Sequence, residues 1–131
     1  MSKWIFIALG GAGGSLLRYT VGGWVQAWTQ VSVHRVFPAG TLVVNVIGCL
    51  AIGILATLFS GPVMIRDEYR AGIIVGILGG FTTFSAFSWE SNRLAADSEF
   101  AYAALNILLS VGLGLGATWG GMKIAQAIWG P

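Results

Sequence analysis

The chain has 131 residues, of which 56% are hydrophobic and 9% charged, with a formal net charge of +2 and a mean hydropathy of +0.79. This composition excludes an ordinary soluble domain and indicates an integral membrane protein. The sequence offers no nucleophile with a base, no cluster of metal ligands and no paired carboxylates at depth, so we expect no enzymatic activity. We also expect no nucleic-acid partner.

The apolar runs predict four membrane spans. A bilayer core needs roughly 20 mainly apolar residues per helix, and the few charges divide the chain into about four such runs. The predicted spans are residues 4–24, 40–60, 71–93 and 100–129. The first follows Lys3 directly, contains Arg18 and lacks a small-residue cleavage site, which argues against a removable signal peptide. We therefore expect an all-α protein with a single four-helix transmembrane domain, 1–131, in the lipid bilayer.

The basic residues give little instruction about orientation. With four spans, one side of the membrane carries Lys3, Arg66, Arg70 and Lys123, and the other carries Arg18, Arg35 and Arg93. Because lysine and arginine bias a loop toward the cytoplasm, four against three is nearly balanced. The sequence therefore predicts dual topology and an antiparallel homodimer, with a two-fold axis in the membrane plane.

Several residue types have structural explanations. Glycines recur four residues apart, which lets helices approach closely in lipid; they are residues 10 and 14, then 72, 76 and 80, and then 112, 116 and 120. The single cysteine, Cys49, is expected to pack between helices and forms no intramolecular disulfide. His34 is expected to be a loop residue, since a metal site needs more ligands.

Polar side chains recur within the predicted spans. The pairs share a helical face within each span; they are Thr41 with Asn45, Ser85 with Ser88, and Asn106 with Ser110. No lysine or acidic residue lies at the same depth, so these groups predict an uncharged path with hydrogen-bond donors for a small anion or a polar neutral solute. The alternative is that they only join helices by hydrogen bonds.

The stretch GGFTTFSAF at residues 79–87 predicts a break in the third span. Gly79 and Gly80 weaken the helix, and Thr82 or Thr83 can cap a new one. The third span then becomes two half-helices, and their free carbonyls would meet at the dimer axis as a small cation site, filled by sodium or water. The ring edges of Phe84 and Phe87, three residues apart, can stabilise a desolvated anion.

Four stretches together resemble the Fluc (CrcB-like) family of small fluoride channels. They read GGAGGSLLRY at 10–19, GTLVVNVIG at 40–48, GILGGFTTFSAFSWE at 76–90 and ALNILLSVGLGLG at 104–116. The resemblance implies an antiparallel dimer with two fluoride pores and a central structural sodium ion held by the Gly79 and Thr82 carbonyls. It also assigns the pore residues, which are Asn45, Phe84 and Phe87, the hydroxyls of Thr41, Ser85, Ser88 and Ser110, and Glu90 near one pore end.

Two positions depart from the common pattern of that family. Ala86 replaces a hydroxyl residue, and Asn106 stands where some members have tyrosine, so its contact with the phenylalanines is open.

Two charged residues have two interpretations each. Arg18 either draws anions to a pore mouth near the membrane surface or is a snorkelling or paired arginine, and Glu90 either shapes a pore entrance or pairs with Arg93.

The expected activity is passive fluoride export across the inner (plasma) membrane by a multi-pass protein. The first alternative is a small proton-coupled exporter of cationic drugs, but the predicted first span contains no Asp or Glu to carry the proton. The second alternative is a membrane assembly protein without transport activity, which would use the glycine faces to bind a partner.

Overall fold

The computed structural model describes residues 2–32, 37–61 and 63–130, so His34 and Arg35 lie outside the described residues. The described chain is helical, and four helical stretches are long and apolar enough to cross a membrane. They are Lys3–Gln30, Ala39–Ser60, Asp67–Ala96 and Phe100–Trp129. The expectation of an all-α protein with four membrane helices is confirmed.

The helices in chain order are α1 (Ser2–Ser32), α2 (Ala39–Ser60), α3 (Asp67–Ala71), η1 (Gly72–Leu78), α4 (Gly79–Phe81), α5 (Phe84–Ala96) and α6 (Phe100–Trp129). The third span thus consists of α3, η1, α4 and α5, and η1 is π-helical, with bonds from residue i to i+5. Helix α1 runs well past the predicted end at Trp24. Residues 25–32 contain neither glycine nor proline, so nothing in them stops the helix.

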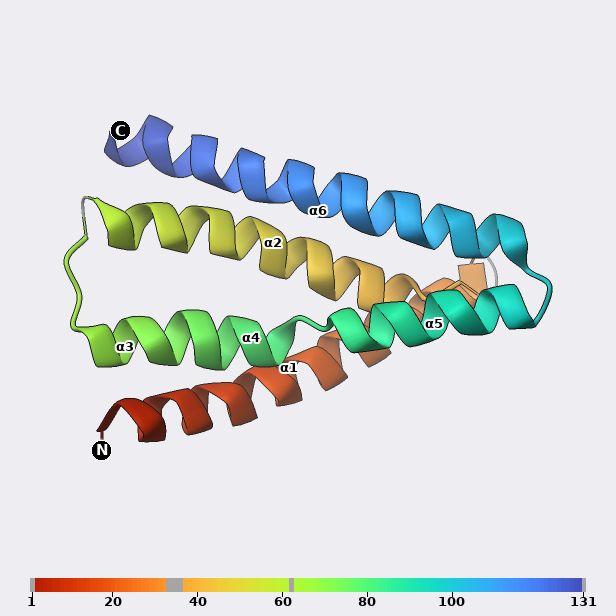
Figure 1. The fold of residues 1–131 in the computed structure, drawn as a ribbon, viewed down its shortest axis with the longest axis horizontal. Helices are drawn as coiled ribbons and strands as arrows, with labels where there is room; N and C mark the ends of the chain where they lie inside the picture. The colour runs from red at the N-terminus through yellow and green to blue at the C-terminus, as the bar shows by residue number, and fades with distance from the viewer. Residues whose placement is uncertain (1, 33–36, 62, 131) are drawn as a thin grey trace.

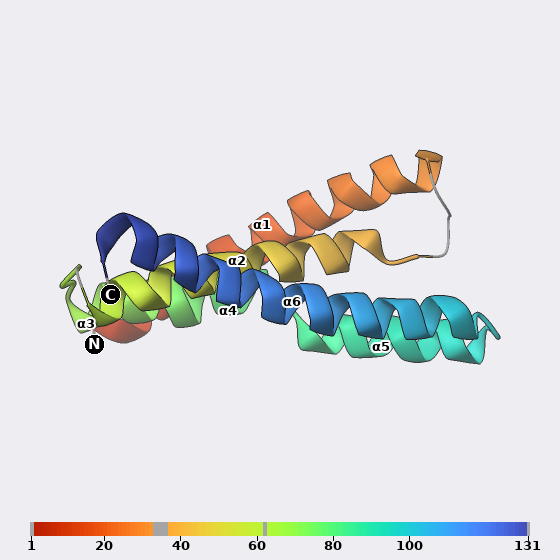
Figure 2. The same cartoon turned by 90° about the horizontal axis from the view of Figure 1, so that it is seen from above.

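The helices form two closely packed pairs, and contacts of α1 with α2 and of α5 with α6 join the pairs. Helix α2 packs along α6, and α1 packs along η1 and α4, while α5 packs on α6 (Figure 1). Both termini lie at the same end of the molecule. Figure 2 shows that the second half of α1 diverges from α5, so the two halves of the third span have different neighbours.

Glycines bring α1 into backbone contact with the third span. A methyl group at Gly10 would collide with the Gly72 carbonyl, and one at Gly76 would lie 2.8 Å from the Ile7 carbonyl oxygen. Only glycine permits this approach, as the four-residue spacing predicts. The α2–α6 pair uses the same device at Gly53.

The third predicted glycine group behaves differently. A methyl group added at Gly112, Gly116 or Gly120 would meet no described atom within 4 Å, so these glycines face away from the described chain. The α6 glycine that packs closely on α2 is instead Gly121, where a methyl group would meet the Leu50 carbonyl. The prediction of close packing is therefore wrong for that group within this chain.

Candidate functional site

The third span is interrupted at Thr82 and Thr83. Both residues have extended backbone, with φ −86° and ψ 158° at Thr82 and φ −152° and ψ 115° at Thr83. The Thr82 hydroxyl donates to the Leu78 carbonyl (2.9 Å) and closes α4, whereas the Thr83 hydroxyl accepts from the Ala86 N–H (3.1 Å) and caps α5. Of the two threonines offered by the sequence, Thr83 is therefore the cap.

Asn45 from α2 holds the backbone of Thr83 at both of its polar atoms. Its Oδ1 accepts from the Thr83 N–H (2.8 Å), and its Nδ2 donates to the Thr83 carbonyl (3.0 Å). In an unbroken helix that N–H would donate to the Gly79 carbonyl. Asn45 thus replaces a missing helical bond, and one of its two amide hydrogens is left for another acceptor.

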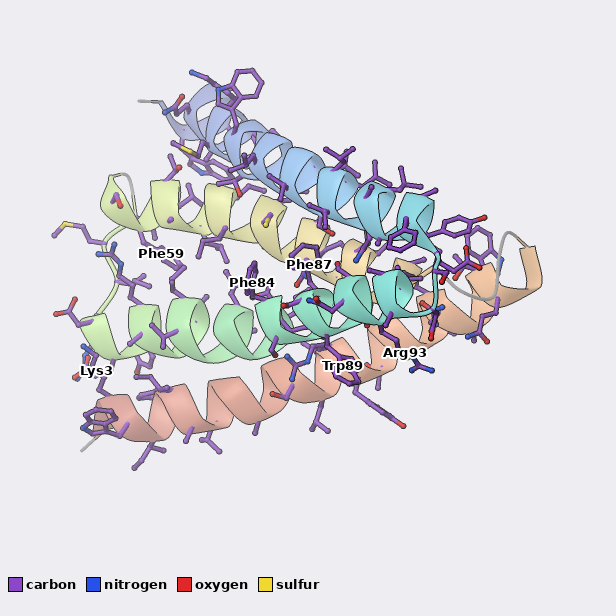
Figure 3. The ribbon with its side chains drawn as sticks, turned by 45° about the vertical axis from the view of Figure 1, so that its right-hand side comes forward. Lys3, Phe59, Phe84, Phe87, Trp89 and Arg93 are labelled. Carbon is purple, nitrogen blue, oxygen red and sulfur yellow. The ribbon has the colours of Figure 1, made fainter. Side chains whose placement is uncertain are left out.

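A cavity of about 370 Å³ lies beside the interruption, between α2, the third span and α6. Asn45, Phe84, Phe87 and Ser110 all line it, so the structure brings these four predicted residues together. Figure 3 shows both phenylalanines rising from α5 toward α2. Their ring centroids are 5.4 Å apart with an interplanar angle of 53°, and Phe84 is 78% exposed.

The hydroxyl of Ser110 differs from other hydroxyls in the helices. Those of Thr57, Ser60 and Ser91 each donate to the carbonyl four residues back at 2.8 Å. The Ser110 Oγ is buried and has no hydrogen-bond partner among the described residues. A buried hydroxyl without a partner is costly, so this group is suited to a ligand in the cavity.

The structure places Asn106 outside this cavity. Asn106 is 1% exposed and donates from Nδ2 to the Ser91 hydroxyl (2.9 Å), which in turn donates to the Phe87 carbonyl (2.8 Å). This chain of bonds joins α6 to α5. For this residue the structure matches the alternative interpretation, in which polar groups connect helices.

A second hollow, of about 920 Å³, lies between α1, α2 and α5. It is lined by Arg18, Thr41, Ser85 and Glu90, so the predicted hydroxyls are divided between two spaces. Trp89 also lines it and points from α5 toward α1 in Figure 3. Ser88 is not among the residues that line either space.

Glu90 pairs with a different partner from the one offered by the sequence. The Thr41 hydroxyl donates to Glu90 Oε1 (2.6 Å), while Arg93 pairs with Asp97 at 3.8 Å. The structure therefore does not support the interpretation in which Glu90 pairs with Arg93. The second carboxylate oxygen, Oε2, is buried without a partner in the described part of the chain.

Arg18 lies at the middle of α1 rather than near its end. Its Nη1 donates to the Thr82 carbonyl at 3.3 Å, and the side chain is half-buried. Helix α1 begins at Ser2 and continues to Ser32, so Arg18 lies close to the middle of the helix and not at the end that the predicted span would give it.

The model of the CrcB-like protein family, described as Camphor Resistance (CrcB), matches residues 5–122. The chain belongs to the CrcB-like family. It is 44% identical to the Fluoride-specific ion channel FluC of Desulforapulum autotrophicum, over 96% of this chain and 98% of that protein. The protein of the same name from Geobacter metallireducens is 47% identical, over 93% of this chain and 95% of its own length. This CrcB-like chain is a multi-pass membrane protein.

The sequence assigns no part in the site to three residues that the structure places there, Gly48, Cys49 and Gln26. A methyl group at Gly48 would collide with the Thr82 side chain, so this glycine allows the interrupted segment to pack closely against α2. Its position three residues after Asn45, on the same face, is the signal that could have identified it. Cys49, expected only to pack, also lines the cavity.

Gln26 is the third such residue, and it ties α1 to the start of α2. Its Nε2 donates to the Phe37 carbonyl, and its Oε1 accepts from the Gly40 N–H, both at 3.0 Å. The Gly40 N–H is one of the free donors at a helix start, so Gln26 caps α2 from another helix. No local pattern could show this, because the bond from Gly40 reaches a residue 14 positions earlier, on a different helix.

Proposed function

We propose that this chain is a fluoride-selective ion channel of the bacterial inner membrane, which lets fluoride leave the cell passively. The observation that carries the proposal is the cavity beside the interruption. It combines a buried hydroxyl without a partner in the described chain, a carboxamide and two aromatic rings, and none of its described lining residues is charged. The relatives named Fluoride-specific ion channel FluC cover almost the whole chain and support the same conclusion.

The groups in the cavity suit a small, strongly hydrated anion. The Ser110 hydroxyl and the remaining amide hydrogen of Asn45 are donors, and the edges of Phe84 and Phe87 are weakly positive. A channel must replace water around an ion without holding the ion so firmly that it stays. Neutral donors in series meet this need better than a lysine would.

We propose that the second hollow is the approach to the cavity. Thr41 and Ser85 offer hydroxyls there, and Arg18 and Glu90 contribute opposite charges on its walls. Ser88 stays a predicted pore residue. Asn106 is better explained by its bond to Ser91, and we leave it out of the proposed path.

We further propose that two chains form an antiparallel homodimer with two pores. Phe84 is 78% exposed next to the polar backbone of the interruption, and irregular backbone within a membrane is tolerated only where protein or water covers it. A second copy would cover both. A reporter fused to the C-terminus should be found on both sides of the membrane, and detection on one side alone would contradict dual topology.

A structural sodium ion is part of this proposal. The Gly79 carbonyl fits, because its helical donor, the Thr83 N–H, is taken by Asn45. The Thr82 carbonyl receives Arg18 at 3.3 Å and keeps a second lone pair. Carbonyls of unwound helices are known sodium ligands, and a bound cation would offset the negative ends of facing half-helices. The described residues offer no group of three or more His, Cys, Asp or Glu that could hold a metal instead.

The test is ion release from liposomes that contain the purified protein. Fast loss of fluoride with retention of chloride, measured with ion-selective electrodes, is expected. Phe84→Ile and Phe87→Ile should each slow fluoride release by about tenfold, the upper range of an aromatic contact. Phe59→Ile, in α2 and outside the cavity, is the matched control and should not.

The alternatives predict other outcomes in the same assay. Proton-linked uptake of an aromatic cation would favour the exporter. If the protein transports neither fluoride nor the aromatic cation, the result would favour an assembly protein. Unchanged fluoride release by both cavity variants would overturn the role of the ring edges.

A further inference from the structure

We infer that Arg18 is a positioning residue for the aromatic pair. Its guanidinium holds the Thr82 carbonyl from α1, while Asn45 holds Thr83 from α2. The two neighbouring residues of the interruption are thus fixed from two different helices. Phe84 follows directly, so the orientation of the first turn of α5 depends on both bonds.

The Thr82 carbonyl needs a donor from outside its own helix. In a continuous helix it would accept from the Ala86 N–H, but that N–H donates to the Thr83 hydroxyl. A buried carbonyl without a donor is costly in a membrane. Arg18 supplies the missing donor, as Asn45 supplies the missing acceptor for the Thr83 N–H.

The position of Arg18 fits this role and not that of a surface charge. It stands at the middle of a 31-residue helix, where a charge is costly and requires a partner. The ion pairs found among the described residues, Arg66–Glu68 and Arg93–Asp97, do not include it. Its hydrogen bond to Thr82 is therefore the contact that explains its depth.

Close packing of α1 sets the reach of the guanidinium. Gly14 lies one turn before Arg18, and a methyl group there would collide with the Ile77 carbonyl and lie 2.9 Å from the Phe81 nitrogen. A methyl group at Gly80 would lie 2.6 Å from the Gly11 carbonyl. These glycines press α1 against α4 just before the interruption, so Arg18 meets Thr82 at a fixed distance.

Arg18 also lies outside the cavity that holds the rings. It lines the hollow between α1, α2 and α5, whereas Phe84 and Phe87 line the cavity between α2, the third span and α6. Its effect on the rings therefore passes through the backbone of Thr82. Because Arg18 also lines the proposed approach, direct attraction of the anion is the competing explanation, and the dependence on ionic strength distinguishes the two.

The first measurement does not depend on conduction. Phe84 is replaced by 4-fluorophenylalanine in the full chain, and the ¹⁹F NMR line is compared among Arg18→Lys, Arg18→Met and Arg93→Met. Lysine keeps a charged donor, and methionine keeps an unbranched side chain without a donor. Arg93, on α5 and not in contact with Thr82, provides the control substitution of an arginine. We expect a shifted or doubled line for Arg18→Met, and a line close to that of the unsubstituted chain for Arg18→Lys and Arg93→Met.

The second measurement is fluoride release, which rests on the proposed channel function. Arg18→Met should slow release by about tenfold or more, the scale of a charge-assisted hydrogen bond, and Arg18→Lys by about threefold at most. The deficit should be the same at low and high ionic strength, because a positioning bond is not screened as long-range attraction is.

The outcomes separate the two proposals. An unchanged ¹⁹F line in Arg18→Met, or a release deficit that disappears in high salt, would overturn the positioning role. A changed line in a protein that releases no fluoride would overturn the channel and leave the positioning role intact. If Arg18→Met yields no folded protein, Arg18→Gln, which keeps a shorter neutral donor, is expected to give an intermediate line shift, and no shift would count against the inference.

Discussion

Asn45 and Asn106 are the same residue type, lie on neighbouring membrane helices and are both predicted from the sequence to line an ion path, yet the structure uses them differently. Asn45 pairs with the backbone of Thr83 and borders the cavity, whereas Asn106 is buried against the Ser91 hydroxyl between α5 and α6. The difference lies in the partner helix. Around Asn45 that helix is interrupted and its backbone groups are free, and around Asn106 it is continuous and offers a side chain.

The comparison teaches that an amide in a membrane span is assigned its role by its neighbour. Where the neighbouring backbone lacks its own partners, the amide stabilises irregular structure and leaves space beside it. Where the neighbouring backbone already makes its own helical hydrogen bonds, the amide bonds to a side chain of that helix and only connects the two helices. Removal of the Asn45 amide should therefore reduce transport more than stability, and removal of the Asn106 amide should reduce stability more than transport.

The largest effect is expected for Asn45→Ala. Losing two bonds to Thr83 leaves a buried N–H and a buried carbonyl unpaired, at about 1–1.5 kcal/mol for each bond, so fluoride release should fall by about 100-fold. Fluoride efflux from liposomes measures this. Asn45→Asp keeps the acceptor for the Thr83 N–H and should be less disruptive to the fold. Release within about threefold of the unsubstituted protein in Asn45→Ala would remove the basis of the comparison.

A smaller effect on transport is expected for Ser110→Ala. Its hydroxyl has no partner in the described chain, so the substitution should slow fluoride release by about tenfold, as for one hydrogen bond to an ion, without lowering the thermal unfolding temperature. Ser60→Ala is the matched control, because that hydroxyl already donates to the Ala56 carbonyl. Equal release rates for the two variants would show that Ser110 does not meet the ion.

Asn106→Ala should change stability rather than transport. The Ser91 hydroxyl loses its donor, and we expect a loss of about 1–3 kcal/mol in the free energy of unfolding, with fluoride release of the folded protein changed by about threefold at most. A double-mutant cycle with Ser91→Ala, followed by thermal unfolding in detergent, isolates the pair. A cycle energy near zero, together with a large loss of fluoride release, would return Asn106 to the ion path.

The smallest effect is expected for a third asparagine, Asn92. It is exposed on α5 and donates to the Ser88 carbonyl of its own helix at 2.9 Å. Asn92→Ala should alter the unfolding free energy by about 0.5 kcal/mol or less and leave fluoride release unchanged. A large change would mean that the identity of the partner does not rank these amides.

Much of the fold could be predicted from the sequence, because hydropathy and spacing are local properties. The four spans, the polar faces and the glycine contacts of α1 follow from patterns within one helix. The paired residues Thr41 and Glu90, or Ser91 and Asn106, lie in different spans and are brought together only by packing. A face can be read from periodicity, but the residue opposite it cannot.

The position of Arg18 escapes the sequence for a related reason. The predicted first span ends at about Trp24, which places the arginine toward one surface. Helix α1 continues to Ser32, and this shift in the end of the helix moves Arg18 to its middle. The sequence could not identify the Thr82 carbonyl as the partner of Arg18 either, because every residue has a backbone carbonyl and the sequence does not show which one is left without a donor.

The π-helical segment η1 has a consequence for the length of the chain. Its turns are wider than those of an α-helix, and Gly72 and Gly76 within it, with Gly80 just beyond, all face α1. Removing one residue from this segment would restore ordinary helical spacing and rotate its first half by about 100° relative to α5. A protein one residue shorter here would keep its hydropathy profile, but its glycines would no longer meet their partner helix, so the correct register of this span depends on a fixed residue count.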